Sequence, residues 1–145
     1  VAHQIKAVCE DVRVDAVKIG MIATAVIAHA VADTLGDLRA ASVVLDPVMV
    51  AESGDRLVGQ ECQDALLNLA PLVSVITPNL FEAAELTGQA HAQTEEDMAT
   101  QGALLRDRGF TSVWVKGGHF DHEDAVDQWV DAQGVLRLTA PRIKT

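Results

Sequence analysis

Four short apolar runs in this chain alternate with segments whose apolar residues recur at helical spacing. The runs lie at residues 15–21, 42–45, 73–77 and 112–116 and are rich in β-branched residues. Apolar runs bounded by glycine or proline are typical of strands buried on both faces of a sheet. Helical spacing occurs at residues 1–12, 24–35, 60–69, 79–86 and 94–108. The pattern therefore predicts strands that alternate with helices.

The ends of the predicted helices carry capping signals. Thr24 suits an N-cap, and Thr94 with Asp97 three residues later resembles a capping box. Gly36 and Gly109 suit C-terminal caps, because glycine readily adopts the left-handed conformation that ends many helices. Pro71 is expected to close the helix over residues 60–69, since proline cannot continue a helix.

Right-handed crossovers between successive strands would give a mostly parallel sheet with helices on both faces. Residues 128–131 and 135–139 flank Ala-Gln-Gly, which predicts an antiparallel hairpin at one edge of that sheet. The chain has 145 residues, a length typical of one domain. We therefore expect a single α/β domain over residues 1–145.

Composition narrows the range of partners. The formal net charge is -10, whereas a surface that follows nucleic-acid phosphates needs a basic patch, so we expect no nucleic-acid partner. No apolar run reaches transmembrane length, so no membrane partner is expected and the cytoplasm is the default location. Cys9 and Cys62 lie far apart in the sequence and are interpreted as buried apolar residues in a reducing compartment.

Polar or glycine residues follow each of the four predicted strands. The ends of successive parallel strands meet at one edge of a sheet, where ligands bind in open α/β folds. Two carboxylates, an ammonium group and flexible glycine backbone together suit phosphoryl transfer, because they can hold Mg²⁺ and neutralise phosphate charge. The residues concerned are Gly20, Met21, Asp46, Val48, Asn79, Glu82, Lys116 and Gly118.

Each of these residues also has a structural interpretation. Asp46 is as well suited to capping a turn before proline as to binding a ligand. Asn79 and Glu82 have capping-box spacing, which is favoured over metal binding when this motif is considered alone. Lys116 can simply end a strand before a tight turn, and Met21 alone favours a core position.

Histidines and acids gather at residues 119–124. Their irregular spacing and the absence of cysteine favour a solvated loop over a transition-metal site. A loop that follows a phosphate-binding strand end could act as a flap over the nucleotide.

The ordered motifs resemble the hydroxymethylpyrimidine/phosphomethylpyrimidine kinases of thiamine biosynthesis, in the ribokinase-like superfamily. The matching stretches are residues 17–21, 43–51 with 53–55, 76–86, 115–119 and 139–143. The resemblance implies a three-layer α/β/α fold and a phosphotransferase that uses ATP and Mg²⁺. Such kinases phosphorylate 4-amino-5-hydroxymethyl-2-methylpyrimidine and then its monophosphate.

The resemblance also implies roles for single residues. Met21, Val48 and Gly20 would contact the pyrimidine substrate. Asp46 and Glu82 would position Mg²⁺ and the phosphates. Lys116, Asn79 and Gly118 would form the ATP side of the site, and residues 118–127 would lie near the nucleotide.

Two departures from the family pattern stand out. The family's Gly-rich Asp-Pro-Ser-Gly-Gly-Ala-Gly segment is absent from this sequence, as is the Gly-Thr-Gly-Cys anion hole that contains the expected catalytic base. We therefore expect a chain truncated at both ends, with its catalytic residue beyond Thr145. Glu52 is a smaller departure, because relatives tend to have Lys or Thr there.

Two other functions stay open from the sequence. The pyridoxal kinases share the Asp-Pro-Val-Met and Thr-Pro-Asn-x-x-Glu motifs, so a pyridoxal- or pyridoxine-type vitamin kinase is the alternative enzyme. A non-catalytic pyrimidine-binding domain of the same fold is the alternative from another class. The expected partners are the pyrimidine and ATP, and a homodimer is expected because relatives commonly form one.

Overall fold

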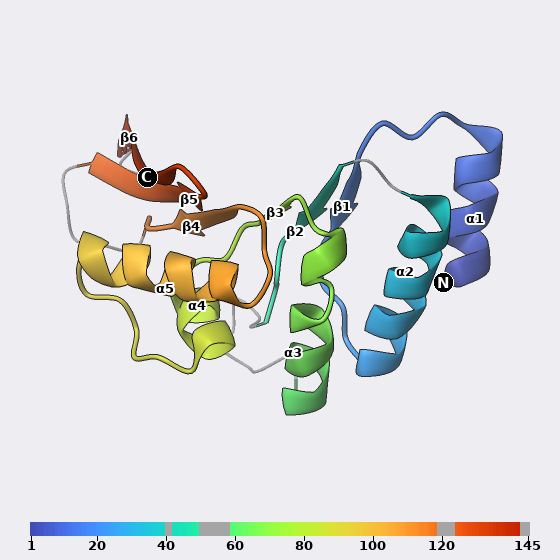
Figure 1. Cartoon of the computed structure of the whole chain (residues 1–145), viewed down its shortest axis with the longest axis horizontal. Helices are drawn as coiled ribbons and strands as arrows, with labels where there is room; N and C mark the ends of the chain where they lie inside the picture. The colour runs from blue at the N-terminus through green and yellow to red at the C-terminus, as the bar shows by residue number, and fades with distance from the viewer. Residues whose placement is uncertain (40–41, 50–58, 119–123, 143–145) are drawn as a thin grey trace. The chain divides into compact units, whose positions relative to one another are not determined.

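The computed structural model describes residues 1–39, 42–49, 59–118 and 124–142. The chain divides into two compact units, Val1–Ser74 and Val75–Thr145. In Figure 1 the first unit runs from blue to green and the second from green to red. Within the described ranges, no helix combines the length and the apolar character needed to cross a membrane.

In the described residues of the first unit there are two parallel strands and three α-helices. Strands β1 (Val17–Ile19) and β2 (Val43–Leu45) pair in parallel, with Val17 opposite Val43 and Ile19 opposite Leu45. Helix α2 (Ala25–Leu38) packs against α1 (Ala2–Asp11) and α3 (Gln60–Leu67), as Figure 1 shows. A short 3₁₀ helix, η1 (Ala70–Leu72), follows α3. The buried apolar residues of this unit include Ile19, Ala28, Val31, Leu35, Val43, Leu45, Leu66 and Leu69.

The two ends of α2 differ in how well the sequence predicts them. Thr24 is the N-cap as predicted, and its hydroxyl oxygen accepts a hydrogen bond from the Ile27 N–H at 3.3 Å. The predicted cap at Gly36 is wrong, because the helix continues to Leu38 and Arg39 caps it in the left-handed conformation at φ 49°. Arg39 N–H donates to the Gly36 carbonyl at 3.2 Å, so the chain turns three residues later than the glycine indicated.

Pro71 also acts differently from the prediction. Helix α3 ends at Leu67, two residues before the predicted end, and Pro71 lies inside η1 rather than closing the helix. Proline is tolerated in the first turn of a helix, because the N–H that it lacks has no partner within the helix there.

The cysteines do not form a disulfide, and only one of them is buried. The Cys62 thiol donates to the Ile22 carbonyl at 3.3 Å, and burial raises the pKa of this thiol above its ordinary value. Cys9 is half-buried, so its interpretation as a buried apolar residue is wrong. The reason is that α1 has no fully buried residue.

Residues 75–118 and 124–142, the described part of the second unit, include four strands. Strands β3 (Val75–Ile76) and β4 (Val113–Lys116) are parallel. Strands β5 (Asp124–Asp131) and β6 (Gly134–Pro141) then form an antiparallel hairpin, and β5 pairs with β4 in antiparallel orientation. Parallel strands followed by a C-terminal hairpin confirm the predicted α/β class. The hairpin strands are longer than predicted, so residues 124–127 lie in a strand rather than a loop.

Helices α4 (Leu80–Thr87) and α5 (Glu95–Asp107) belong to this unit, and α5 packs on β4 and β5 (Figure 1). The contact is close at Gly102, where an added Cβ would lie 2.7 Å from Cγ2 of Val130. The predicted box of Thr94 and Asp97 opens α5 as expected. Gly109 ends the helix as predicted: it follows the C-cap residue Arg108, has a φ of 105°, and its N–H donates to the Arg106 carbonyl at 2.8 Å.

Alternation along β5 separates the two faces of the hairpin sheet. Val126, Gln128 and Val130 are buried. Asp127 and Trp129 lie on the opposite face and are half-buried. Their register partners on β4 are Lys116 and Trp114, so these four side chains share one face.

Candidate functional site

One group of predicted site residues, in the first unit, lies at the ends of β1 and β2. Asp46 N–H donates to the Ile19 carbonyl at 2.8 Å, which extends the parallel pairing one residue beyond β2. Asp46 therefore lies beside the point where the chain leaves β1 for Gly20. Val48 N–H then donates to the Asp46 carbonyl at 2.9 Å, so the chain turns immediately after the carboxylate.

Asp46 has a cation beside it. Lys18 Nζ lies 3.3 Å from Oδ2 of Asp46, and the side chains are 67% and 20% exposed respectively. Because the lysine is well solvated, such a pair contributes about 1 kcal/mol or less to stability. The carboxylate is thus reachable from solvent and lies at the edge predicted from its place after a buried strand.

The three predicted pyrimidine contacts lie in the same unit. Met21 is 55% exposed, so the alternative interpretation of this residue as core is wrong. Val48 is half-buried. A Cβ added at Gly20 would meet nothing within 4 Å, so the structure leaves open space beside this glycine.

A second group of predicted site residues, in the second unit, lies where β3 and β4 end. Lys116 N–H donates to the Pro78 carbonyl at 2.8 Å, and Lys116 forms a parallel bridge with Asn79. Asn79 is the N-cap of α4. The pairing therefore brings the predicted ATP-binding lysine next to the start of α4.

Asn79 and Glu82 form the predicted capping box. Glu82 N–H donates to Oδ1 of Asn79 at 2.9 Å, and Asn79 N–H donates to Oε2 of Glu82 at 2.8 Å. Glu82 is only 5% exposed. The capping interpretation is confirmed, and one carboxylate oxygen of Glu82 already accepts a backbone hydrogen bond.

The donor chemistry suits a hard cation. Mg²⁺ in nucleotide sites is commonly held by one or two carboxylates together with phosphate oxygens and waters, so Asp46 and Glu82 are suitable oxygen donors. Over residues 1–39, 42–49, 59–118 and 124–142, no group of three or more His, Cys, Asp or Glu could hold a metal ion. Each carboxylate thus offers oxygen donors of the kind that Mg²⁺ takes, and the described residues form no metal cage from protein ligands alone.

Gly117 and Gly118, the two glycines after β4, differ in the space available for a side chain. An added Cβ at Gly117 would collide with the Val126 carbonyl oxygen and lie 2.8 Å from Cε of Met98. Gly118 has nothing within 4 Å of the same position. Gly117 N–H donates to Oδ1 of Asp127 at 2.9 Å. Sequence reasoning missed Asp127, although its place opposite Lys116 in a longer hairpin could have indicated it.

Some predicted features lie outside the described residues. These are Glu52, the Ser-Gly-Asp sequence at 53–55, and residues 119–123 of the histidine and acid cluster. Asp124, the last residue of that cluster, begins β5.

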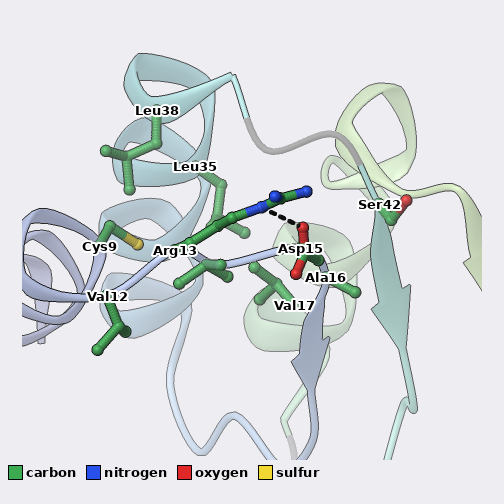
Figure 2. A pocket seen from close by; sticks show the side chains of 10 residues that line it. Cys9, Val12, Arg13, Asp15, Ala16, Val17, Leu35, Leu38 and Ser42 are labelled. Carbon is green, nitrogen blue, oxygen red and sulfur yellow. Dashed lines mark hydrogen bonds and ion pairs between the residues drawn. The ribbon is translucent and has the colours of Figure 1, made fainter.

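A pocket of about 200 Å³ in the first unit is not part of the predicted site. Figure 2 shows it between α1, α2 and the start of β1, with Arg13 and Asp15 paired at 2.8 Å. Gly20 and Asp46 lie past the other end of β1 and do not line this pocket.

Comparison with known proteins identifies the family. The family model described as phosphomethylpyrimidine kinase matches residues 1–145. The chain belongs to this family. The hydroxymethylpyrimidine/phosphomethylpyrimidine kinase of Escherichia coli is 47% identical over 146 residues, which cover 100% of this chain and 55% of that protein. The chain thus spans about half the length of this curated relative.

Solved structures show the same fold. The phosphomethylpyrimidine kinase of Clostridium difficile is similar with a TM-score of 0.84 and 36% identity, over 96% of this chain and 60% of that one. The Bacillus subtilis pyridoxal kinase, solved as an ADP complex, has a TM-score of 0.90 and 36% identity, over 99% of this chain and 54% of that one. Because both TM-scores are high, the backbone fold does not distinguish phosphomethylpyrimidine kinases from pyridoxal kinases. The 47% identity to the E. coli enzyme places pyridoxal kinases further away.

Proposed function

We propose that the full-length protein transfers the γ-phosphoryl group of ATP to the hydroxymethyl group of 4-amino-5-hydroxymethyl-2-methylpyrimidine, and then phosphorylates the monophosphate. The observation that carries the proposal is the family match over residues 1–145, with 47% identity to the E. coli enzyme. The two units are then parts of one kinase domain. Thiamine biosynthesis is the pathway that this family serves.

Lys116, Asn79 and Gly118 form the ATP side of the proposed site. The position of Lys116 beside the start of α4 supports this role, because a lysine there can neutralise charge on a transferring phosphate. A Cβ added at Gly118 would meet nothing within 4 Å, which supports the approach of a phosphate oxygen to the backbone there.

Asp46 and Glu82 are the proposed ligands of Mg²⁺, directly or through water. The cation neutralises charge on the phosphates during transfer. The capping box supports the role of Glu82, since Asn79 N–H fixes one carboxylate oxygen and so orients the other. Exposure of the Asp46 side chain supports its role, because the carboxylate is accessible to a hydrated cation.

Met21, Val48 and Gly20 are the proposed contacts of the pyrimidine ring. A thioether side chain adapts its shape and contacts aromatic rings favourably, and Met21 is exposed at the end of β1. No residue of this chain is proposed as the base that accepts the hydroxyl proton. The family pattern predicts that base in a Gly-Thr-Gly-Cys segment.

The test is direct. Full-length protein, ATP, Mg²⁺ and the hydroxymethylpyrimidine should yield the monophosphate and then the diphosphate, detected by mass spectrometry. Pyridoxal in place of the pyrimidine should react with a lower kcat/KM. Faster turnover of pyridoxal would favour the vitamin-kinase alternative, which the TM-score of 0.90 to the Bacillus subtilis enzyme keeps as a candidate. Pyrimidine binding without any product would favour the non-catalytic alternative.

We also propose a homodimer, as the resemblance implies. Light scattering on the full-length protein tests it, and a mass equal to one chain would contradict it.

A further inference from the structure

We propose that Asp127 is a positioning residue for the nucleotide phosphates, because it holds the backbone where β4 ends. This inference rests on the proposed binding of ATP by Lys116 and Gly118. Asp127 itself lies on β5 and is the register partner of Lys116.

The carboxylate of Asp127 makes two hydrogen bonds, one with each oxygen. Oδ1 accepts from Gly117 N–H at 2.9 Å, and Oδ2 accepts from Nε1–H of the Trp114 indole at 3.0 Å. Trp114 precedes Lys116 by two residues and Gly117 follows it. A single side chain of β5 therefore holds β4 on both sides of the lysine.

Gly117 lies in a crowded position that only glycine can occupy. It is buried, and its Cα faces the Val126 carbonyl and the Met98 side chain so closely that no Cβ fits. Its N–H lies one residue beyond the last residue of β4, where the regular pairing with β5 has ended. Asp127 supplies the acceptor that the sheet no longer provides. Loss of that acceptor should displace Gly117 together with its chain neighbours, Lys116 and Gly118.

Asp131 provides a natural matched control at the other end of β5. Its Oδ2 accepts from Nε1–H of Trp129 at 2.8 Å, and its Oδ1 accepts from Gln133 N–H at 2.7 Å. The chemistry is the same as at Asp127, with one indole and one backbone N–H. The backbone that Asp131 holds is the hairpin turn, which contains none of the proposed site residues.

The test is Asp127→Asn in the full-length protein, with Asp131→Asn beside it. Asparagine offers one carbonyl oxygen in place of two carboxylate oxygens, so its NH₂ group must face one of the two N–H donors. We expect the dissociation constant for ATP and the KM for ATP to rise about tenfold in Asp127→Asn. The KM for the pyrimidine should stay at its wild-type value. Asp131→Asn should lower the melting temperature and leave both ATP constants unchanged.

A second substitution provides a rescue. Trp114→Phe removes the indole N–H. In the double variant the side-chain oxygen of the asparagine at position 127 can therefore accept from Gly117 N–H, and its NH₂ group no longer faces another N–H donor. Trp114 is 37% exposed, which limits the packing lost with the smaller ring. The ATP constants of Trp114→Phe/Asp127→Asn should return to within about threefold of wild type.

Asp127→Glu keeps the test decisive if Asp127→Asn does not fold. It retains the charge and both acceptors but shifts them by one methylene group, and the dissociation constant for ATP should again rise. Unchanged ATP constants in both Asp127 variants would overturn the inference, as would an equal rise in Asp131→Asn. If the wild type binds ATP but phosphorylates no pyrimidine, the proposed substrate is wrong, and the ATP dissociation constants of the variants still decide the inference about Asp127. If the wild type binds no ATP, both the proposed function and the inference about Asp127 are wrong.

Discussion

The segments that follow β2 and β3 have a similar outline, since each strand stops at a proline with an acid nearby. After β2 the acid is Asp46, which is 20% exposed and lies 3.3 Å from the solvated Lys18 ammonium. After β3 the acid is Glu82, which is 5% exposed and tied to Asn79 in a capping box. The two carboxylates thus differ in how firmly the fold holds them.

An acidic residue after a strand can serve the stability of the fold, bind a ligand, or do both. A capping box stabilises a helix by about 1 kcal/mol whether or not a ligand binds, so Glu82 has a reason to be present without any metal. The pair of Asp46 with an exposed lysine adds little to stability. For Glu82, a capping role must therefore be separated from the proposed metal role.

The largest expected effect comes from Asp46→Asn in the full-length protein. Removal of one negative charge from the proposed Mg²⁺ site should lower kcat by about a hundredfold or more. The melting temperature should change far less than kcat does, because asparagine has nearly the same size as aspartate and the pair with the 67% exposed Lys18 contributes about 1 kcal/mol or less. Enzyme assays and thermal denaturation on the same sample check both statements.

Asp15→Asn is the matched control for this substitution. Asp15 lies in the same unit and pairs with exposed Arg13 at 2.8 Å, but it precedes β1 instead of following a strand. Its kcat should equal that of the wild type. An equal fall in the two variants would mean that general charge, rather than the position of Asp46, sets the rate.

Glu82 allows the two roles to be separated by a pair of variants. Glu82→Gln should keep the capping box, since glutamine can also accept from the N-cap backbone, but lower kcat about tenfold or more by removing the charge. Glu82→Ala should lower both kcat and the melting temperature. Full activity in Glu82→Gln would leave Glu82 with its capping role alone.

A smaller effect is expected from matched substitutions in the two capping boxes of the second unit. Asn79→Ala and Thr94→Ala each remove the side-chain oxygen of an N-cap, so each should lower the free energy of unfolding by about 1 kcal/mol. Urea denaturation measures this loss. Only Asn79→Ala should also raise the KM for ATP, because Thr94 opens α5 and is not a proposed site residue. A raised KM in both variants would indicate a general loosening of the unit.

The smallest expected effect concerns acid stability. The backbone N–H of Gln93, and after it the Thr94 hydroxyl, hold the pKa of Asp97 below its ordinary value of 3.8. A carboxylate with a lowered folded-state pKa stabilises the fold above its unfolded pKa, and this stability is lost as the pH falls through the folded value. Asp97→Asn should therefore reduce the loss of stability below about pH 4, measured by denaturation at several pH values. An identical pH dependence in variant and wild type would contradict it.

The capping boxes were predictable because their chemistry is local. Asn79 with Glu82 and Thr94 with Asp97 are each three residues apart, and both boxes form as the spacing indicated. The parallel order of the strands in each unit and the C-terminal hairpin likewise follow from apolar runs and turn residues. The strand pairings are long-range, with Val17 opposite Val43, but chain order and the handedness of the crossover leave few possible arrangements.

Other features depend on packing that the sequence alone does not display. The helix end at Arg39 shows that a non-glycine residue can adopt the left-handed cap when a nearby glycine stays helical. The crowding at Gly117 arises from Val126 and Met98, which are distant in sequence. The role of Asp127 follows from the register of β4 and β5, because a shift of one residue would turn it to the other face.

The most direct test of the central claim is a titration of the full-length protein with Mg²⁺, at fixed ATP and hydroxymethylpyrimidine, with phosphoryl transfer as the readout. The account predicts a rate that requires Mg²⁺, a half-saturating concentration raised at least several-fold in Asp46→Asn, and no change in Asp15→Asn. A wild-type rate and an unchanged Mg²⁺ dependence in Asp46→Asn would contradict it.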